Sequence, residues 1–237
     1  MIPVIIGVSF LVFFIMDLAP GDAVDILAPE GATAEDLEAI RHDLGLDQPV
    51  IVRYVKYMGG MLHGDMGVSY VSKTDVFDTY MEKLPATIKL SFASILVSIL
   101  LSVPLGIYSA TRQGTVQDNI SMIVAMIGLS MPNFWLGLLL IIVFSLNLGW
   151  FPSGGDQTLS SIVLPAITIG TGLMATLTRT TRSSMLDVLK QEYLRTARAK
   201  GIPEKIVITS HALRNALIPI ITIIGTQLAG VLGGSVL

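Results

Sequence analysis

The side chains best able to bind a partner lie in one charged stretch of this 237-residue chain, EYLRTARAKGIPEK, from Glu192 to Lys205. Arg195, Arg198 and Lys200 supply most of its positive charge. The rest of the chain is apolar, since 52% of all residues are hydrophobic and only 14% are charged. A charged interruption in such a chain is either a topological anchor at a membrane surface or a docking surface for another protein.

Side chains for other kinds of chemistry are scarce. The chain has no cysteine, which excludes disulfides, thiolate metal sites and thiol catalysis. His42, His63 and His211 are scattered and form no pair at metal-ligand spacing. No nucleotide-binding loop of the form G-x-x-x-x-G-K-[ST] occurs, so any ATP that drives this protein is hydrolysed by another chain. We therefore expect no catalytic, cofactor-binding or metal-binding residue here.

The sequence around the charged stretch predicts helix, turn and helix. From Ser184 onward an apolar stripe at spacings of three or four residues predicts one helix, with stripe residues Leu186, Leu189, Tyr193 and Ala197. Gly201 is a natural helix stop, and Pro203 with Glu204 is a natural restart. Because an anchor needs only a few basic residues, this internal punctuation favours a docking surface over an anchor.

The apolar residues are gathered in blocks long enough to cross a bilayer as helices, which takes about 20 residues. With a mean hydropathy of +0.71, the chain is predicted to be an all-α polytopic transmembrane bundle. No Lys or Arg precedes the first block, so we interpret it as a retained span and not as a cleaved signal peptide. Five blocks are seen: Ile2 to Leu18, Ala86 to Ala110, Ile120 to Leu146, Ile162 to Thr178, and Leu213 to the last residue.

Charge predicts how the chain is oriented. Residues 19–85 carry twelve acidic and five basic side chains, whereas residues 179–212 carry seven basic and three acidic ones. Excess Lys and Arg near span ends marks the cytoplasmic side. We therefore expect a cytoplasmic amino end, a partial first span at 1–18, an extracytoplasmic helical region at 19–85, and a transmembrane core at 86–237 with its cytoplasmic loop at 179–212.

The acidic outer region is predicted to contain short helices. Thr33, followed three residues later by Asp36, resembles a capping box. A second amphipathic segment begins near Pro49. These helices either pack on the outer leaflet or the bundle, which we favour, or receive a partner protein.

The spans lack ionisable residues at their centres, which argues against an ion-coupled carrier. They contain prolines instead, and Pro104, Pro132 and Pro219 are candidates for kinks that permit gating. Proline is also simply commoner in membrane helices than in soluble ones, so this alternative stays open. Glycines such as Gly128 and Gly170 permit close helix contact.

Several motifs together resemble one family. They are Tyr193-Leu194-Arg195-Thr196-Ala197-Arg198-Ala199-Lys200-Gly201, then His211-Ala212-Leu213-Arg214-Asn215-Ala216-Leu217-Ile218-Pro219, together with Ala19-Pro20-Gly21-Asp22, His63-Gly64-Asp65-Met66-Gly67-Val68-Ser69, Ser130-Met131-Pro132 and Thr178-Arg179-Thr180-Thr181-Arg182-Ser183-Ser184-Met185. The chain is similar over nearly its whole length to binding-protein-dependent ABC importer permeases, in particular the B-type permease of the dipeptide, oligopeptide and nickel group. The first two motifs resemble that family's cytoplasmic EAA loop, although the general Glu-Ala-Ala pattern is only partly kept.

The resemblance implies a set of partners. It implies a second, homologous permease subunit, two ATPase subunits that bind ATP and Mg, an extracytoplasmic solute-binding protein and the lipid bilayer, with no nucleic acid. It also implies a sixth span, so a chain truncated at both ends is expected. The residues implied to dock the ATPase are Tyr193, Arg195, Thr196, Ala197, Arg198, Ala199, Lys200, Gly201, Ile202 and Pro203.

The function expected from the resemblance is that of a transport subunit in the cell (inner) membrane, part of an ATP-driven importer for short peptides. Nickel, glutathione and oligosaccharide importers resemble it equally at this level. Two further hypotheses are an ATP-independent or ion-coupled carrier or channel, in which the basic loop is only an anchor, and a structural membrane subunit without a pathway.

Overall fold

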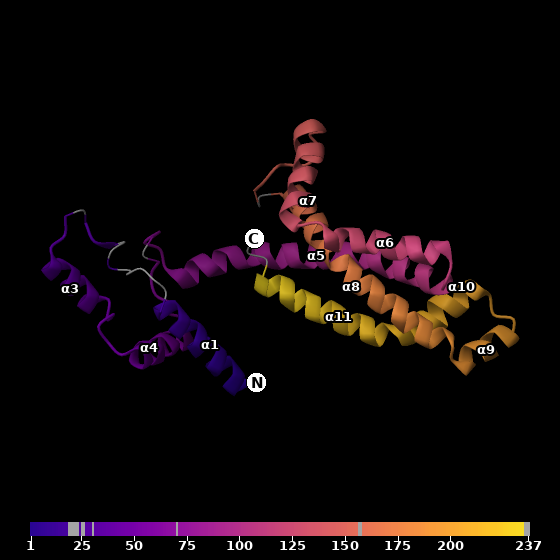
Figure 1. Ribbon diagram of the computed structural model, residues 1–237, viewed down its shortest axis with the longest axis horizontal. Coiled ribbons are helices and arrows are strands. Elements are labelled where there is room, and N and C mark those ends of the chain that lie inside the picture. The colour runs from indigo at the N-terminus through magenta and orange to yellow at the C-terminus, as the bar shows by residue number, and fades with distance from the viewer. Residues whose placement is uncertain (19–23, 25–26, 30, 70, 156–157, 235–237) are drawn as a thin grey trace. The chain divides into compact units, whose positions relative to one another are not determined.

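The computed structural model describes residues 1–18, 24, 27–29, 31–69, 71–155 and 158–234. These residues are mainly helical and contain no strand beyond an isolated antiparallel bridge between Val68 and Asp75. The all-α prediction is thereby confirmed (Figure 1). The chain divides into two compact units, Met1–Lys83 and Leu84–Leu237. The motif at 19–22 and the last three residues lie outside the described residues.

The first unit contains the short helices expected in the acidic region. Helix α3 (Ala34–Asp43) begins with the predicted capping box, in which Thr33 and Asp36 bond each other's backbone N–H groups. Hydrogen bonds from Thr33 also lower the pKa of the Asp36 carboxyl, because they favour its charged form. This capping box is confirmed, and it fixes where α3 begins.

Helix α4 (Val50–Leu62) packs against the apolar helix α1 (Ile2–Asp17) chiefly through one aromatic side chain, with a second ring contact and an ion pair beside it. Tyr54 is 9% exposed, meets the rings of Phe10 and Phe13 edge-on, and has its hydroxyl 2.7 Å from Ser9 Oγ. The Tyr54 hydroxyl also donates to the carbonyl of Ile6. The pair of helices is therefore held by a ring with a satisfied polar tip.

Replacing Tyr54 by alanine is expected to loosen α4 from α1 by about 2 kcal/mol, since each edge-on ring contact contributes ~0.5–1.5 kcal/mol. Tyr54→Phe keeps both ring contacts and loses only the hydroxyl's bonds. Trypsin cleavage after Arg53, whose side chain is 22% exposed beside Asp17, measures the change. Tyr54→Ala should be cut several-fold faster than Tyr54→Phe, and equal rates would contradict this account.

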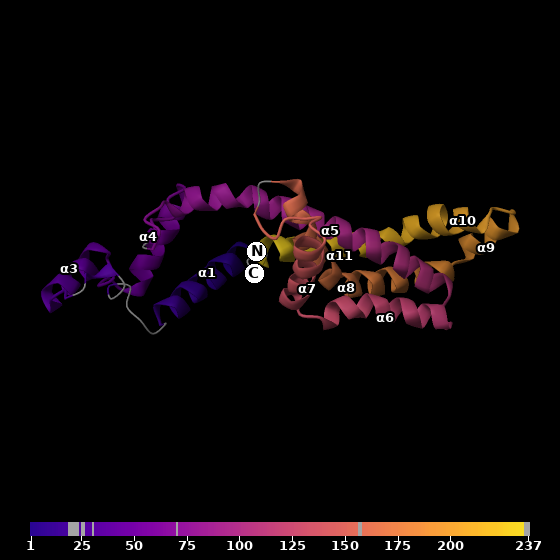
Figure 2. The same ribbon diagram turned by 90° about the horizontal axis from the view of Figure 1, so that it is seen from above.

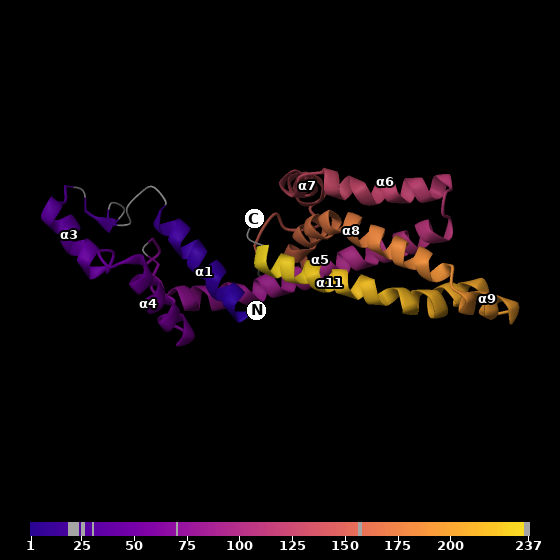
Figure 3. The same cartoon turned by 60° about the horizontal axis from the view of Figure 1, so that its bottom comes forward.

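The second unit is a helical bundle centred on α8 (Val163–Leu189). Figures 2 and 3 show α5 (Val76–Thr111), α6 (Val116–Ser130) and α11 (Leu213–Gly234) running alongside it, and α6 and α11 both pack on α8. Further elements of this unit are a 3-10 turn η2 (Leu159–Ile162), α9 (Glu192–Ala199), α10 (Glu204–Ile206) and a π-helical stretch η3 (Val207–Ala212) that continues into α11. The short helices α9 and α10, with η3, connect α8 to α11 at one end of the bundle.

Small residues allow the helices of the bundle to approach closely. A Cβ on Gly106 would lie 2.6 Å from Thr181 Cβ, and one on Gly170 would lie 2.8 Å from the Ser94 carbonyl oxygen. A Cβ on Gly128 would overlap the carbonyl oxygen of Thr171. These are contacts between α5 or α6 and α8, as expected for membrane helices that pack through small residues.

Three helical stretches in the described part are long and apolar enough to cross a membrane: Val76–Thr111, Leu159–Leu189 and Glu204–Gly234. A fourth is obtained if α6 and the following helices count as one bent span. Helix α1 is apolar but only 16 residues long. Length therefore supports three or four spans where the sequence predicts five.

The three candidate prolines behave differently. Helix α5 continues through Pro104, and α11 continues through Pro219. At Pro132, in contrast, α6 ends and α7 (Asn133–Leu140) begins, and the chain turns by 95°. Figure 1 shows α7, followed by the π-helical η1 (Ile141–Asn147), rising away from α6. Of these three prolines, only Pro132 therefore lies at a break between helices.

Candidate functional site

The charged stretch begins with a break that the sequence did not predict. Helix α8 ends at Leu189, Gln191 is extended, and α9 starts at Glu192. The expected single helix from Ser184 is therefore wrong. The break shifts the helical register, so Leu194 is fully buried while Tyr193 is 43% exposed. Tyr193 is nevertheless held in place, because its hydroxyl accepts a hydrogen bond of 2.8 Å from Asn215 Nδ2 on α11.

The end of α9 is the predicted glycine turn. Gly201 has a φ of +75°, the left-handed region that glycine adopts without strain. Its N–H donates to the Arg198 carbonyl, and the N–H of Ile202 donates to the Ala197 carbonyl. This pair of bonds is the Schellman arrangement that satisfies the last carbonyls of a helix. Pro203 then caps α10, so the predicted stop and restart are both confirmed.

An ion pair spans this turn. Arg198 donates from Nε to Glu204 Oε2 at 3.0 Å and from Nη2 to Oε1 at 2.9 Å. The bidentate bond raises the pKa of the Arg198 guanidinium, because it favours the charged form. The pair is largely exposed and so contributes at most about 1 kcal/mol to stability. Its effect is to fix the direction in which α10 leaves the turn.

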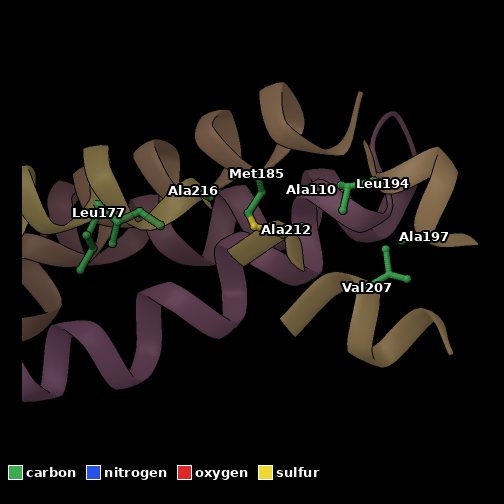
Figure 4. Close-up of a cluster of buried hydrophobic side chains, with 9 residues drawn as sticks. Ala110, Leu177, Met185, Leu194, Ala197, Val207, Ala212 and Ala216 are labelled. Carbon is green, nitrogen blue, oxygen red and sulfur yellow. The ribbon is translucent and has the colours of Figure 1, made fainter. Parts of the chain in front are cut away.

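The inner face of α9 is seated on a hydrophobic cluster. Leu194 and Ala197 lie with residues from α5, α8, η3 and α11, and Ile202 packs against the same cluster. Figure 4 shows Leu194 near Ala110, and Ala197 near Val207. The buried members are Ala110, Leu177, Met185, Leu194, Ala197, Val207, Ala212, Ala216 and Ile220. Helix α9 and the turn that follows it are therefore packed on the bundle.

The outer face of α9 is polar and exposed. Of the ten residues predicted to dock a partner, two turn inward, since Ala197 is buried and Ile202 is partly buried. Six others are exposed together on α9 and its end: Tyr193, Arg195, Thr196, Arg198, Ala199 and Lys200. Gly201 and Pro203 shape the turn itself. The sequence analysis did not single out Leu194 or Asn215, whose side chains fix α9 to the bundle. The helical spacing of three or four residues identifies Leu194 as a buried position only when α9 is counted as a separate helix.

A cavity of about 1100 Å³ lies in the same unit, beside the bend at Pro132. Met131, Asn133, Pro165 and Gly172 are among its lining residues, and among residues 71–155 and 158–234 no charged side chain lines it. Gln227 of α11 also lines it, and in the described part of the chain the buried Oε1 of this residue has no hydrogen-bond partner. The bundle thus contains a cavity next to the 95° bend between α6 and α7.

Residues 102–237 match the family model described as binding-protein-dependent transport system inner membrane component. Residues 1–91 match its companion, the N-terminal part of such membrane components. The chain belongs to this family. The family that the motifs resemble is thereby confirmed, and the whole of α9 and its turn fall inside the larger match.

Curated relatives share most of their length with this inner membrane component. The oligopeptide transport system permease protein AppB of Bacillus subtilis is 44% identical over 246 residues, which cover 99% of this chain and 78% of AppB. The glutathione transport system permease protein GsiC of Escherichia coli K12 is 39% identical over 236 residues, covering 100% of this chain and 77% of GsiC. Both relatives are named as transport permeases.

Proposed function

We propose that this chain is one transmembrane subunit of an ATP-driven importer for short peptides, coupled to a separate ATPase through the surface of α9. The observation that carries the proposal is the construction of that surface. Its inner face is locked by Leu194 and the Schellman turn, while its outer face leaves Arg195, Thr196 and Lys200 free to contact another protein. A segment that only anchors the topology needs basic charge, but it does not need a helix packed firmly on the bundle.

The partners are a second, homologous permease, two ATPase subunits that bind ATP and Mg, and an extracytoplasmic solute-binding protein. The subunit lies in the cell (inner) membrane with its amino end in the cytoplasm. This orientation is supported by the charges, because basic residues outnumber acidic ones at 179–212, whereas acidic residues outnumber basic ones at 19–85. ATP hydrolysis belongs to the partner subunit. The chain itself carries no catalytic, cofactor-binding or metal role.

Short peptides are the proposed cargo because AppB is named for oligopeptides and GsiC for glutathione, itself a small peptide. The cavity beside Pro132 fits a pathway for solutes of varied charge, since its lining, as far as the described residues go, carries no charged side chain that would select one sign. Closure of the ATPases would move α9 and change the access of this space. Pro132 is the proposed gate, with Pro104 and Pro219 as flexible points within their helices.

Gly201→Val tests the coupling. Nothing lies within 4 Å of a Cβ at this position, so the only strain is that of the left-handed backbone, about 1–2 kcal/mol for an ordinary residue and more for a β-branched one. In proteoliposomes containing the ATPases and the binding protein, we expect ATP-driven peptide uptake and transport-coupled ATP hydrolysis to fall several-fold. Membrane insertion should persist.

Gly201→Asn is the matched control, since asparagine tolerates the left-handed conformation, and it should keep most of the uptake. Uptake that is unchanged in Gly201→Val would refute docking through this turn. Uptake that survives ATP depletion but collapses with the ion gradient would instead establish the ion-coupled carrier.

A further inference from the structure

An ion pair between the buried Asp118 carboxylate and the partly buried Arg182 ties four segments together at the end of the bundle that carries α9. Asp118, in the first turn of α6, is 2% exposed. Its carboxylate accepts hydrogen bonds from Arg182 Nε at 2.7 Å and Arg182 Nη2 at 2.6 Å. Ser109 Oγ of α5 and the N–H of Gly114, in the turn between α5 and α6, also donate to it.

The arrangement is specific in its geometry. A carboxylate removed from water is tolerated only where charge and hydrogen bonds compensate it, and here all four donors come from fixed positions. The bidentate fork of Arg182 additionally sets the relative rotation of α6 and α8. A buried pair of this kind is weak support for stability but a strong constraint on the mutual placement of the elements that carry it.

The ion pair lies next to the hydrophobic cluster on which α9 packs. Arg182 is one helical turn before Met185, a fully buried member of the cluster on which Leu194 rests. The opposite end of α6 is also fixed on α8, because Gly128 lies against the carbonyl of Thr171. Two attachments, one at each end, make α6 and α8 a single body.

The first break in the helix beyond this body is at Pro132. Met131 is extended, and the chain turns by 95° into α7, which also packs on α8. A displacement of α9 that moves α8 should therefore move α6 with it. Such a movement would reach the break, where residues Met131 and Asn133 line the cavity.

We infer that Asp118 and Arg182 are positioning residues that carry the movement of α9 to α6 and so to the cavity at Pro132. The inference rests on the proposed function, because it assigns the internal linkage that the coupling requires. It predicts that loosening the pair separates ATP hydrolysis from transport, while the docking surface itself stays intact.

The test measures peptide imported per ATP hydrolysed in proteoliposomes containing the complete importer. Asp118→Asn should lower this ratio at least fivefold while ATP hydrolysis stimulated by the binding protein persists. Arg182→Lys keeps the charge but not the bidentate fork, and should lower the ratio about threefold. Glu82→Gln is the control: it removes the charge of an exposed ion pair with Lys83 and should keep the wild-type ratio.

A covalent bridge separates a positioning role from a merely structural one. The chain has no cysteine, so the pair Asp118→Cys and Arg182→Cys can be joined selectively with a short bismaleimide. The unbridged double variant should be uncoupled, and bridging should restore at least half of the ratio. Because this readout is a gain on cross-linking, it remains decisive even if Asp118→Asn fails to accumulate in the membrane.

The inference is overturned if Asp118→Asn and Arg182→Lys keep the wild-type ratio, if transport and hydrolysis fall in equal proportion, or if bridging restores nothing. A wild-type importer that shows no ATP-driven uptake would instead overturn the proposed function. The two failures are therefore distinguished within one set of measurements.

Discussion

Replacing Leu194 by aspartate is expected to detach α9 from the bundle and abolish ATP-driven uptake. Leu194 is fully buried against Met185, Val207 and the other cluster residues. The substitution removes a packed side chain, which costs about 2–5 kcal/mol, and adds an unpaired charge, which costs several more. Since α9 has only eight residues, it cannot hold its place without this contact.

Exposure of the hydrophobic cluster beneath α9 measures this detachment. Val207 is fully buried in the same cluster, so a cysteine placed there should react with maleimide only when α9 leaves. The matched control is Arg195→Asp, the same substitution at the next residue, where the side chain is 83% exposed. The control should leave the Val207 cysteine protected. Protection that persists in Leu194→Asp would show that the cluster does not hold α9.

Replacing Gly128 by alanine is expected to force α6 away from α8 and lower the free energy of unfolding of the bundle by about 2 kcal/mol. The added methyl group would overlap the carbonyl of Thr171, a backbone atom that cannot rotate aside. Overpacking typically costs 1–3 kcal/mol. Alanine favours a helix over glycine by about 1 kcal/mol, so any loss of stability is due to the clash.

Gly225→Ala supplies the comparison, because this glycine also lies within a helix and nothing is within 4 Å of a Cβ there. The melting temperature in detergent should fall clearly for Gly128→Ala and stay level or rise for Gly225→Ala. If both variants melt alike, the close approach of α6 to α8 plays no part in stability.

Local signals were sufficient for some of these features. The capping box at Thr33 and the stop at Gly201 depend on residues within five positions of each other, and both could be predicted from the sequence. The same holds for the helical class of the chain, which follows from apolar blocks. The outer face of α9 was also largely predictable, because charge alone favours exposure.

Other features depend on contacts that are distant in sequence. Asp118 and Arg182 are separated by 64 positions, and as isolated residues they are only an acid and a base near span ends. The break at Gln191 has neither proline nor glycine, so no residue type marks it. Pro104, Pro132 and Pro219 look alike in sequence, yet only Pro132 coincides with a change of direction, because the other two lie within helices that continue.

The serines of α5 have a consequence for how the protein is made. Ser91, Ser94, Ser98 and Ser102 are fully buried, and Ser91 and Ser94 bond carbonyls of their own helix. Ser102 instead donates to the Met174 carbonyl of α8, and Ser98 Oγ has no partner among the described residues. Half of the apolar window of α8 is covered by neighbours, so α8 also gains from protein contact. The serine face of α5 is therefore not fully satisfied by lipid alone, and we expect α5 and α8 to pair as they enter the bilayer.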